Sequence, residues 1–206
     1  NHLSGEPILI SHLVNLACQA TAILTANHTL RVADTSPEAR QTLDDLLAQI
    51  DNQQATIDAF KGERAMGVMT FQQMRDGTLG ADDADAAGMG NIGLLSKVWL
   101  GQAYLNDDEA KYIDLMNKQI EVAELPRAQR EQEMEPIWDE LENSGLRHML
   151  SRLLVPALNA AVDATDRQDA SIRCLRILLA VEASEITSLA DVDLPQAVKN
   201  DPFNGH

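Results

Sequence analysis

The chain has 206 residues, and its 32 Asp and Glu residues outnumber its 16 Lys and Arg residues, giving a net charge of −16. Phosphate backbones and anionic lipid surfaces repel such a chain, which argues against a nucleic-acid partner. Apolar residues make up 45% of the chain but aromatic residues only 3%, so the core must be aliphatic. An aliphatic composition favours helix packing over sheet.

The first predicted helix runs to about Val32. Ser4 and Pro7 mark its start, because proline is tolerated in a first helical turn. Ser36-Pro37-Glu38 is a second start signal that combines a cap, a proline at the first helical position and an acid near the positive end of the helix dipole. The apolar pattern then continues to about Arg75, as one long helix or two collinear ones. In the first helix, apolar residues recur at helical spacing at Leu9, Leu13, Leu16, Ala17, Ala20, Ile23, Leu24 and Leu30.

Residues 76–91 are rich in Gly, Ala and Asp, and they predict a mobile loop. Proline and glycine punctuate the chain beyond it, and Pro156 should kink the helix that contains it. Further helices are expected over residues 92–105, 107–124, 126–143, 146–164 and 166–188.

No stretch shows the alternation of apolar and polar residues that is typical of strands. The sequence therefore predicts an all-α fold, an irregular bundle of six to eight helices with an extended C-terminal tail over 189–206. A single helical domain covering 1–206 is preferred over two hairpin layers separated by the loop. Pro195 and Pro202 oppose helix in the tail, and we expect Pro202 and Phe203 to anchor it on the helices.

The two cysteines, Cys18 and Cys174, each lie in an apolar helical stretch. No CxxC motif or Cys/His cluster occurs, so a structural zinc site is not expected. One interpretation is that both are small buried hydrophobic side chains. The alternative is a disulfide that joins the first and last helices and suits an oxidising compartment.

Two loop motifs resemble ligand sites but lack what those sites require. Residues 88–93 spell GxGxxG, yet the acidic segment 81–87 stands where a dinucleotide site needs a strand. Asp83, Asp85 and Gly88 match three positions of a calcium loop, but Leu94 occupies the position of the bidentate glutamate. We therefore predict neither a cofactor nor a metal site.

Catalytic signatures are also missing from the sequence. No GxSxG or HExxH motif occurs, and the five histidines are expected to be exposed or partly buried. Glu182 and Glu185 share a helix face, but such pairs are usually solvated. No catalytic residue is predicted, and the balance is against an enzyme.

Glu63 and Arg64 form the candidate polar cluster. Arg64 falls on the predicted buried stripe of Ile57, Phe60, Val68 and Phe71, and Glu63 borders that stripe. Buried charges need partners. We expect a partly buried ion-pair network that holds a neighbouring helix, with a ligand-facing or partner-facing cluster as the alternative.

Four segments together resemble a group of uncharacterised bacterial helical proteins that follow a single N-terminal membrane anchor. The segments are Pro7-Ile8-Leu9-Ile10-Ser11-His12-Leu13-Val14, Gly62-Glu63-Arg64-Ala65, Arg173-Cys174-Leu175-Arg176-Ile177-Leu178-Leu179-Ala180 and the Leu-Pro…Asp-Pro-Phe-x-Gly tail. The tail alone is similar to that of type II secretion pseudopilins. Pseudopilins contain a small sheet that this sequence does not predict, so their calcium site is not transferred to Asp201.

This resemblance implies an extracytoplasmic location, periplasmic or in the cell envelope, with an anchor upstream of Asn1. No run of 18 apolar residues occurs, so membrane contact is expected only through a segment outside this chain. The first hypothesis is a non-catalytic domain for assembly or protein interaction, with an unidentified protein partner. The alternatives are an enzyme or small-ligand binder at Glu63 and Arg64, and a tetratricopeptide-like peptide binder suggested by Trp99-Leu100-Gly101-Gln102-Ala103-Tyr104.

Overall fold

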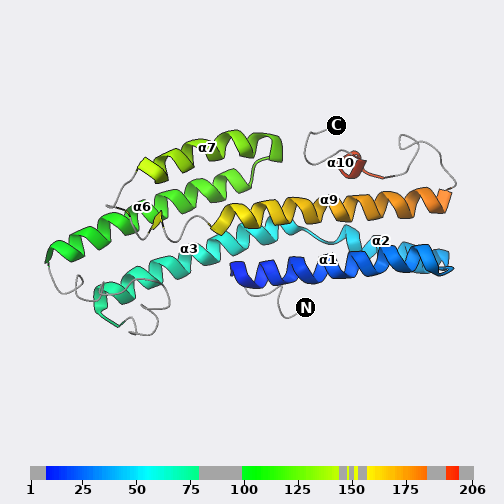
Figure 1. The fold of residues 1–206 in the computed structure, drawn as a ribbon, viewed down its shortest axis with the longest axis horizontal. Helices are drawn as coiled ribbons and strands as arrows, with labels where there is room; N and C mark the ends of the chain where they lie inside the picture. Colours follow the sequence, from blue (N-terminus) through cyan, green and yellow to red (C-terminus); the bar gives the residue numbers. More distant parts are fainter. Residues whose placement is uncertain are drawn as a thin grey trace. The chain divides into compact units, whose positions relative to one another are not determined.

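The computed structural model describes residues 8–78, 99–143, 148, 151–152, 157–184 and 194–199. Within these ranges every regular element is helical, which confirms the all-α fold class (Figure 1). The helices are α1 (Leu9–Val32), α2 (Pro37–Ala48), α3 (Asn52–Asp76), α6 (Trp99–Ala123), α7 (Arg127–Asn143), α9 (Ala157–Ser184) and α10 (Gln196–Lys199).

The chain divides into two compact units. Residues 1–56 and 160–206 form unit 1, and residues 57–159 form unit 2. The boundaries fall within α3 and within α9, so each of these helices contributes residues to both units. The single domain expected over 1–206 stays a prediction.

The starts of α2 and α3 follow from their capping residues. The Ser36 side chain accepts a hydrogen bond from the Ala39 amide at 3.3 Å, and Pro37 begins α2, as the sequence predicts. At the next boundary, the Asp51 carboxylate accepts from the Gln54 amide at 2.9 Å. This cap starts a new helix at Asn52, so the segment to Arg75 is two helices rather than one.

The predicted loop begins where expected, because α3 ends at Asp76. Gly77 has φ 66°, a left-handed conformation that glycine adopts at low cost. The Thr78 amide donates to the Gln73 carbonyl at 2.9 Å, which closes the helix end. The rest of the predicted loop, residues 79–91, lies outside the described residues.

Two predicted helix breaks are wrong. Helix α6 continues through Asp107, and α9 continues through Asp166, although the sequence predicted a new helix at each point. The polar residues there serve tertiary contacts instead of ending a helix. Fully buried Asp108, for example, accepts from the Ser151 amide at 3.1 Å and from the Ser151 hydroxyl at 2.6 Å.

The predicted extended tail also needs correction within 194–199. Gln196–Lys199 form one helical turn, α10, and the Val198 amide donates to the Pro195 carbonyl at 2.9 Å. Proline lacks only its own amide hydrogen, so its carbonyl can still accept the first bond of a following turn. Pro202, Phe203 and Asp201 lie outside the described residues, as do Pro156 and the GxGxxG and calcium-like segments.

Unit 1 has an aliphatic core between α2 and α9, with α1 beside them (Figure 1). An ion pair crosses this core from α9 to α2, in which Arg176 Nε lies 2.7 Å and Nη2 lies 3.3 Å from the two carboxylate oxygens of Asp44. The paired, fork-like geometry fixes the rotation of α9 against α2. The buried cluster consists of Leu47, Ile172, Leu175 and Leu179, with Ile23, Ala26, Leu30, Leu43, Ile50 and Leu178 packed against it.

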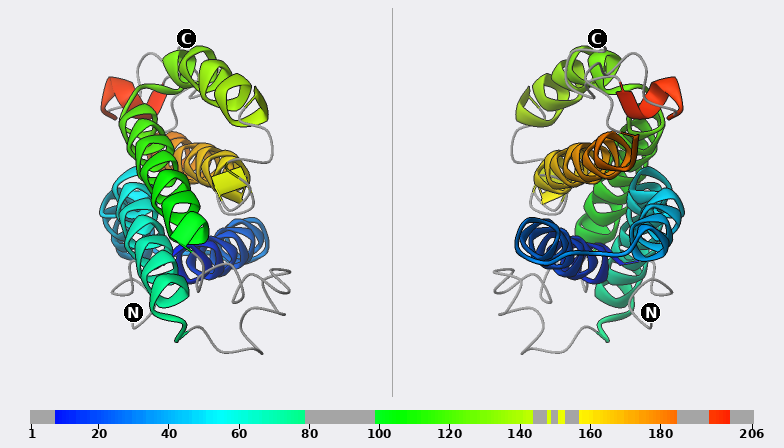
Figure 2. Two further views of the ribbon diagram at one scale, coloured as in Figure 1. Left: turned by 90° about the vertical axis from the view of Figure 1, so that its left-hand side faces the viewer. Right: turned by 90° about the vertical axis from the view of Figure 1, so that its right-hand side faces the viewer.

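Unit 2 packs α3, α6 and α7, and Figure 2 shows α6 alongside α3 in both views. Its interior is more completely apolar than that of unit 1. On its surface, Lys111 and Lys118 of α6 both reach Glu140 of α7, and their hydrogen bonds lower the pKa of that carboxyl. The interior side chains include Phe60, Phe71, Leu105, Leu115, Met116, Ile120, Ile137 and Leu141.

Candidate functional site

The predicted polar cluster at Glu63 and Arg64 links α3 to α6. Both side chains are half-buried, and Arg64 Nη1 donates to the side-chain oxygen of Asn117. The backbone carbonyl of Glu63 accepts from the Tyr112 hydroxyl at 2.8 Å. These contacts join α3 to α6, but the partner of Arg64 is the amide of Asn117 rather than an acid, so the expected ion-pair network stays a prediction.

Close packing at Gly67 explains a glycine within α3. A Cβ atom at this position would lie 2.3 Å from the Tyr112 ring, far inside van der Waals contact. The Tyr112 ring also packs against Phe71, with ring centroids 5.7 Å apart. Burial raises the pKa of the Tyr112 phenol. The group that approaches the α3 backbone at Gly67 is therefore the aromatic side chain of Tyr112 in α6.

The two cysteines are free and exposed. The interpretation of Cys18 and Cys174 as buried hydrophobic side chains is therefore wrong. Each lies on the outward side of its helix, because the apolar stretches around them have two faces and only one of these packs inward. The structure shows no bond between the two thiols.

Unit 1 contains a buried polar cluster that the sequence did not predict. His12 of α1 is only 5% exposed, and its Nε2 lies 2.9 Å from Oγ1 of Thr56 in α3 and 3.1 Å from Oγ1 of Thr165 in α9. The two hydroxyl oxygens lie 2.8 Å apart. Three helices thus meet at three polar atoms.

The hydroxyl partners assign the role of the His12 ring. Thr56 donates to the Asn52 carbonyl at 2.8 Å, and Thr165 donates to the Ala161 carbonyl at 2.9 Å. When both hydroxyl protons point to these carbonyls, the hydroxyl lone pairs face Nε2, which then acts as the donor; when one hydroxyl donates to the other instead, its carbonyl bond is given up. Burial lowers the pKa of His12, which favours the neutral ring.

A second polar chain joins the same three helices. Gln19 Nε2 donates to the side-chain oxygen of Asn52 at 3.0 Å, and Asn52 Nδ2 donates to Asp169 at 2.9 Å. Burial raises the pKa of the Asp169 carboxyl, whereas the Asn52 hydrogen bond opposes the rise. Two buried amide atoms, Oε1 of Gln19 and Nε2 of Gln168, have no hydrogen-bond partner. This chain orders α1 against α3 and α9, but it contains no catalytic geometry that we recognise.

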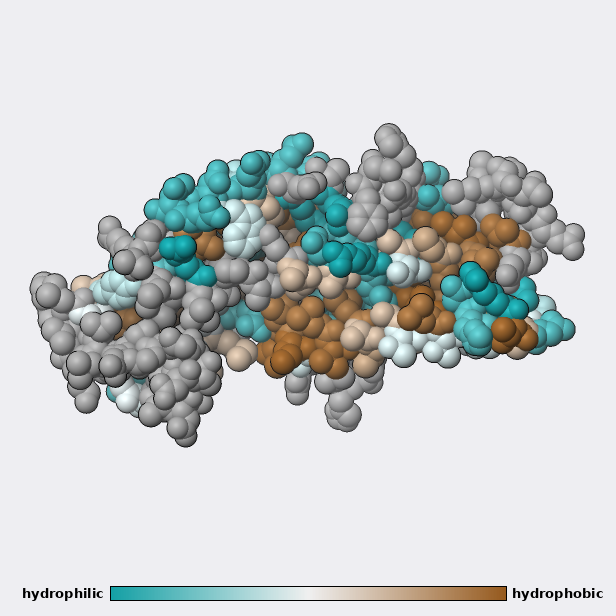
Figure 3. Space-filling view, in the orientation of Figure 1, coloured by the Kyte–Doolittle hydropathy of each residue, from teal (hydrophilic) through white to brown (hydrophobic). Residues whose placement is uncertain are grey.

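The outward face of α1 is apolar. Ile10 is 67% exposed, Leu24 is 70% exposed, and Leu13 and Val14 are 37% and 44% exposed. Figure 3 shows hydrophobic residues gathered over the N-terminal half of this helix. Two of the four buried α1 residues, Ser11 and His12, are polar. Helix α1 therefore turns a partly polar face inward and an apolar face outward, and such apolar patches often mark interaction sites.

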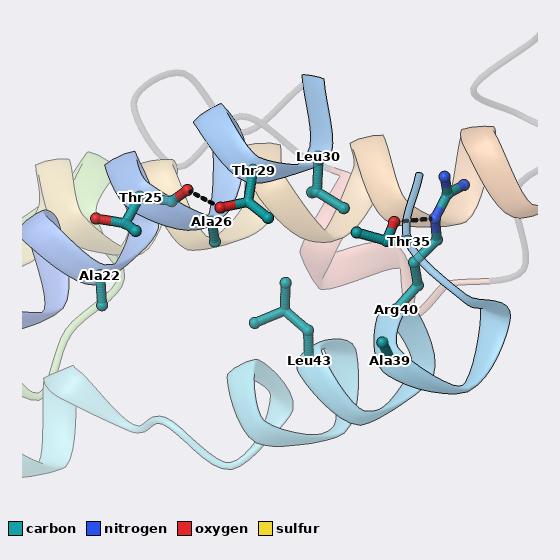
Figure 4. A pocket seen from close by; sticks show the side chains of 9 residues that line it. All are labelled: Ala22, Thr25, Ala26, Thr29, Leu30, Thr35, Ala39, Arg40 and Leu43. Atoms are coloured by element: carbon teal, nitrogen blue, oxygen red, sulfur yellow. Dashed lines mark hydrogen bonds between the residues drawn. The ribbon is translucent and has the colours of Figure 1, made fainter. Parts of the chain in front are cut away.

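A groove of about 440 Å³ lies between α1 and α2 in unit 1 (Figure 4). The hydroxyls of Thr25 and Thr29 donate to carbonyls one turn earlier in α1, so they are occupied within their own helix. Arg40 Nε donates to Oγ1 of Thr35 at 2.8 Å at one end of the groove. The groove is lined mainly by methyl and methylene groups of Ala22, Ala26, Leu30, Ala39 and Leu43.

Helix α1 bears on the expectation that membrane contact is made only through a segment outside the chain, which stays a prediction. By length and composition, Leu9–Val32 would suffice to cross a membrane. Of the most apolar 18-residue stretch of this helix, 22% is buried within the protein. The core helix of a soluble protein can be as long and as apolar as this one. Among the described residues, no group of three or more His, Cys, Asp or Glu side chains is placed to hold a metal ion.

Comparison with family models, with curated proteins and with solved structures finds no match to this chain.

Proposed function

We propose that this chain is a non-catalytic helical domain for assembly, located outside the cytoplasm and held near a membrane by a segment outside the chain. Its contact surface for another protein is the outward apolar face of α1. The location rests on the family resemblance of the sequence. The contact surface rests on the exposure of α1.

The observation that carries this proposal is the reversed polarity of α1. Burying an apolar side chain of this size against a partner is worth about 1.5–3 kcal/mol, whereas buried polar groups contribute mainly orientation. In α1, Ile10 and Leu24 remain two-thirds exposed while His12 is buried. Large apolar side chains of α1 thus remain available on its outer side, which is what an assembly surface requires.

A protein partner fits α1 better than a bilayer. Crossing a bilayer would remove His12 and Gln19 from their hydrogen bonds to α3 and α9, and unpaired polar groups are costly in lipid. Helix α1 also contains no Trp, Tyr or Lys, and Arg31 in its last turn is its only residue of the kinds that anchor helices at membrane interfaces.

The alternatives at other places have less support. Arg64 bonds to Asn117, and the Glu63 carbonyl bonds to Tyr112, so these two hydrogen bonds serve the packing of α3 on α6. A tetratricopeptide-like groove would need the helix that the sequence placed at 92–105, much of which lies outside the described residues. We keep both as alternatives to the assembly role.

Photo-crosslinking in cells tests the contact surface. A photoreactive residue at Leu24 should form a discrete protein adduct, because this side chain lies on the proposed face. The matched control is Leu46 of α2, which is 58% exposed and lies on another helix. Adducts of lipid from Leu24, or equal adducts from both positions, would contradict the proposal.

Thiol labelling tests the location. Cys174 is exposed, so a maleimide that cannot cross membranes should label it in intact cells. Labelling that appears only after lysis would place the domain in the cytoplasm.

A further inference from the structure

We infer that the partner of the α1 face is a second copy of this chain, with the two α1 helices packed antiparallel about a two-fold axis. This inference rests on the proposed function and names its partner. The contact consists of six exposed residues, defined here as the outer seam: Ile10, Val14, Ala17, Thr21, Leu24 and His28.

The spacing of the outer seam is that of a coiled coil. Its members follow one another by steps of four and three residues, which average 3.5 residues per turn. All six are exposed, while Leu9, His12 and Leu16 on the opposite side are buried. The inward face of α1 is therefore used by unit 1, and the seam is a second, separate helix-packing face.

The seam complements itself when two copies run antiparallel. Pairing Ala17 with Thr21 of the second copy aligns Val14 with Leu24 and Ile10 with His28, so every seam residue has a partner. The two-fold axis then passes level with Gln19. Small side chains meet at the centre, where they allow close approach. The apolar pair Val14 and Leu24 lies on both sides of the centre, and the outermost pairs set Ile10 against His28. An isologous contact needs this self-complementarity.

Charge favours the same contact. The chain carries a net charge of −16, so two copies repel each other over most of their surface. Residues 8–30 contain no Asp, Glu, Lys or Arg. Two copies that meet along α1 therefore place no like charges in direct contact, and the apolar burial is not opposed locally.

Analytical ultracentrifugation of the purified chain over a concentration series tests association. We expect a monomer–dimer equilibrium, and Ala17→Glu should raise the dissociation constant at least 100-fold because it places two carboxylates and extra volume at the closest approach. Ala110→Glu is the matched control, since Ala110 is exposed on α6 and the charge change is the same. It should leave the equilibrium nearly unchanged.

Disulfide trapping tests the orientation. In a Cys18→Ser, Cys174→Ser background, a mixture of Val14→Cys and Leu24→Cys chains should give the mixed dimer on mild oxidation. Parallel helices would instead give Val14→Cys chains linked to themselves. In the unmodified chain, Cys18 flanks the seam near the axis and should link two copies, whereas exposed Cys174 should not.

The outcomes separate the two proposals. A chain that stays monomeric at all concentrations, or that is linked equally through Cys18 and Cys174, overturns the second copy as partner. If Leu24 then crosslinks to a different protein in cells, the assembly role of α1 stands. A folded Ala17→Glu variant, shown by an unchanged helical circular dichroism spectrum, is required for each comparison.

Discussion

Helices α1 and α6 have nearly the same length, 24 and 25 residues, but they meet opposite conditions in the fold. Helix α6 buries Tyr112, Leu115 and Met116 and extends its lysines to Glu140 on the outside. Helix α1 buries His12 and exposes Ile10 and Leu24. The difference teaches that helices of similar length can differ in how much apolar surface they bury: α6 exposes no large apolar side chain among those described, whereas α1 packs Ile23, Ala26 and Leu30 on the core but leaves Ile10 and Leu24 exposed.

The largest expected effect concerns the packing of α6 against α3. Gly67→Ala should lower the free energy of unfolding by about 1–3 kcal/mol, because the new Cβ would overlap the Tyr112 ring. In a Tyr112→Leu background the same change should be neutral or stabilising, since alanine forms helix better than glycine by about 1 kcal/mol. Equal losses in both backgrounds, measured by urea unfolding, would show that the ring is not the cause.

A smaller effect tests the polar inward face of α1. Thr165→Val keeps the side-chain shape but removes one acceptor from His12 Nε2, and it should cost about 1 kcal/mol in unfolding free energy. Thr42→Val is the control, because Thr42 also donates to the carbonyl one turn earlier but is exposed on α2. A loss no larger for Thr165 than for Thr42 would mean that the cluster adds no stability.

The smallest effect is a dependence of stability on pH. Burial lowers the folded-state pKa of His12 below 6.5, so the unfolded chain binds the proton more readily. The contribution of His12 to the free energy of unfolding is complete above pH 6.5, and it is lost as the pH falls through that value towards the folded-state pKa. His12→Gln should flatten this part of the profile, measured by chemical unfolding, and His28→Gln on the exposed side of α1 should not.

Asp169 affects the pH dependence of stability in the opposite direction to His12. Its folded-state pKa is raised above 3.8, so its contribution is most favourable below that value and is lost as the pH rises through the folded pKa. Asp169→Asn, which keeps an acceptor for Asn52, should remove this loss and raise stability at neutral pH. A fall in stability at neutral pH would mean that the ionised carboxylate is favourable where it lies.

The candidate site was only partly readable from the sequence. The start of α2 and the end of α1 follow from local signals, since Ser36-Pro37 caps one helix and the apolar pattern stops at Val32. The His12 cluster joins residues 44, 109 and 153 positions apart, and no local pattern marks such a contact. Its only sequence signal was a histidine within a largely apolar helical stretch, which is equally typical of an exposed position.

The sequence by itself determined the helical class, several helix boundaries and the acidic composition, because these depend on local propensity, capping and residue content. Only the tertiary structure decided which side of each helix faces inward. An apolar residue spaced every three or four positions can face either way, and neighbouring helices settle the choice through packing. For α1 they placed His12 inside beside Thr56 and Thr165 and left Leu24 outside.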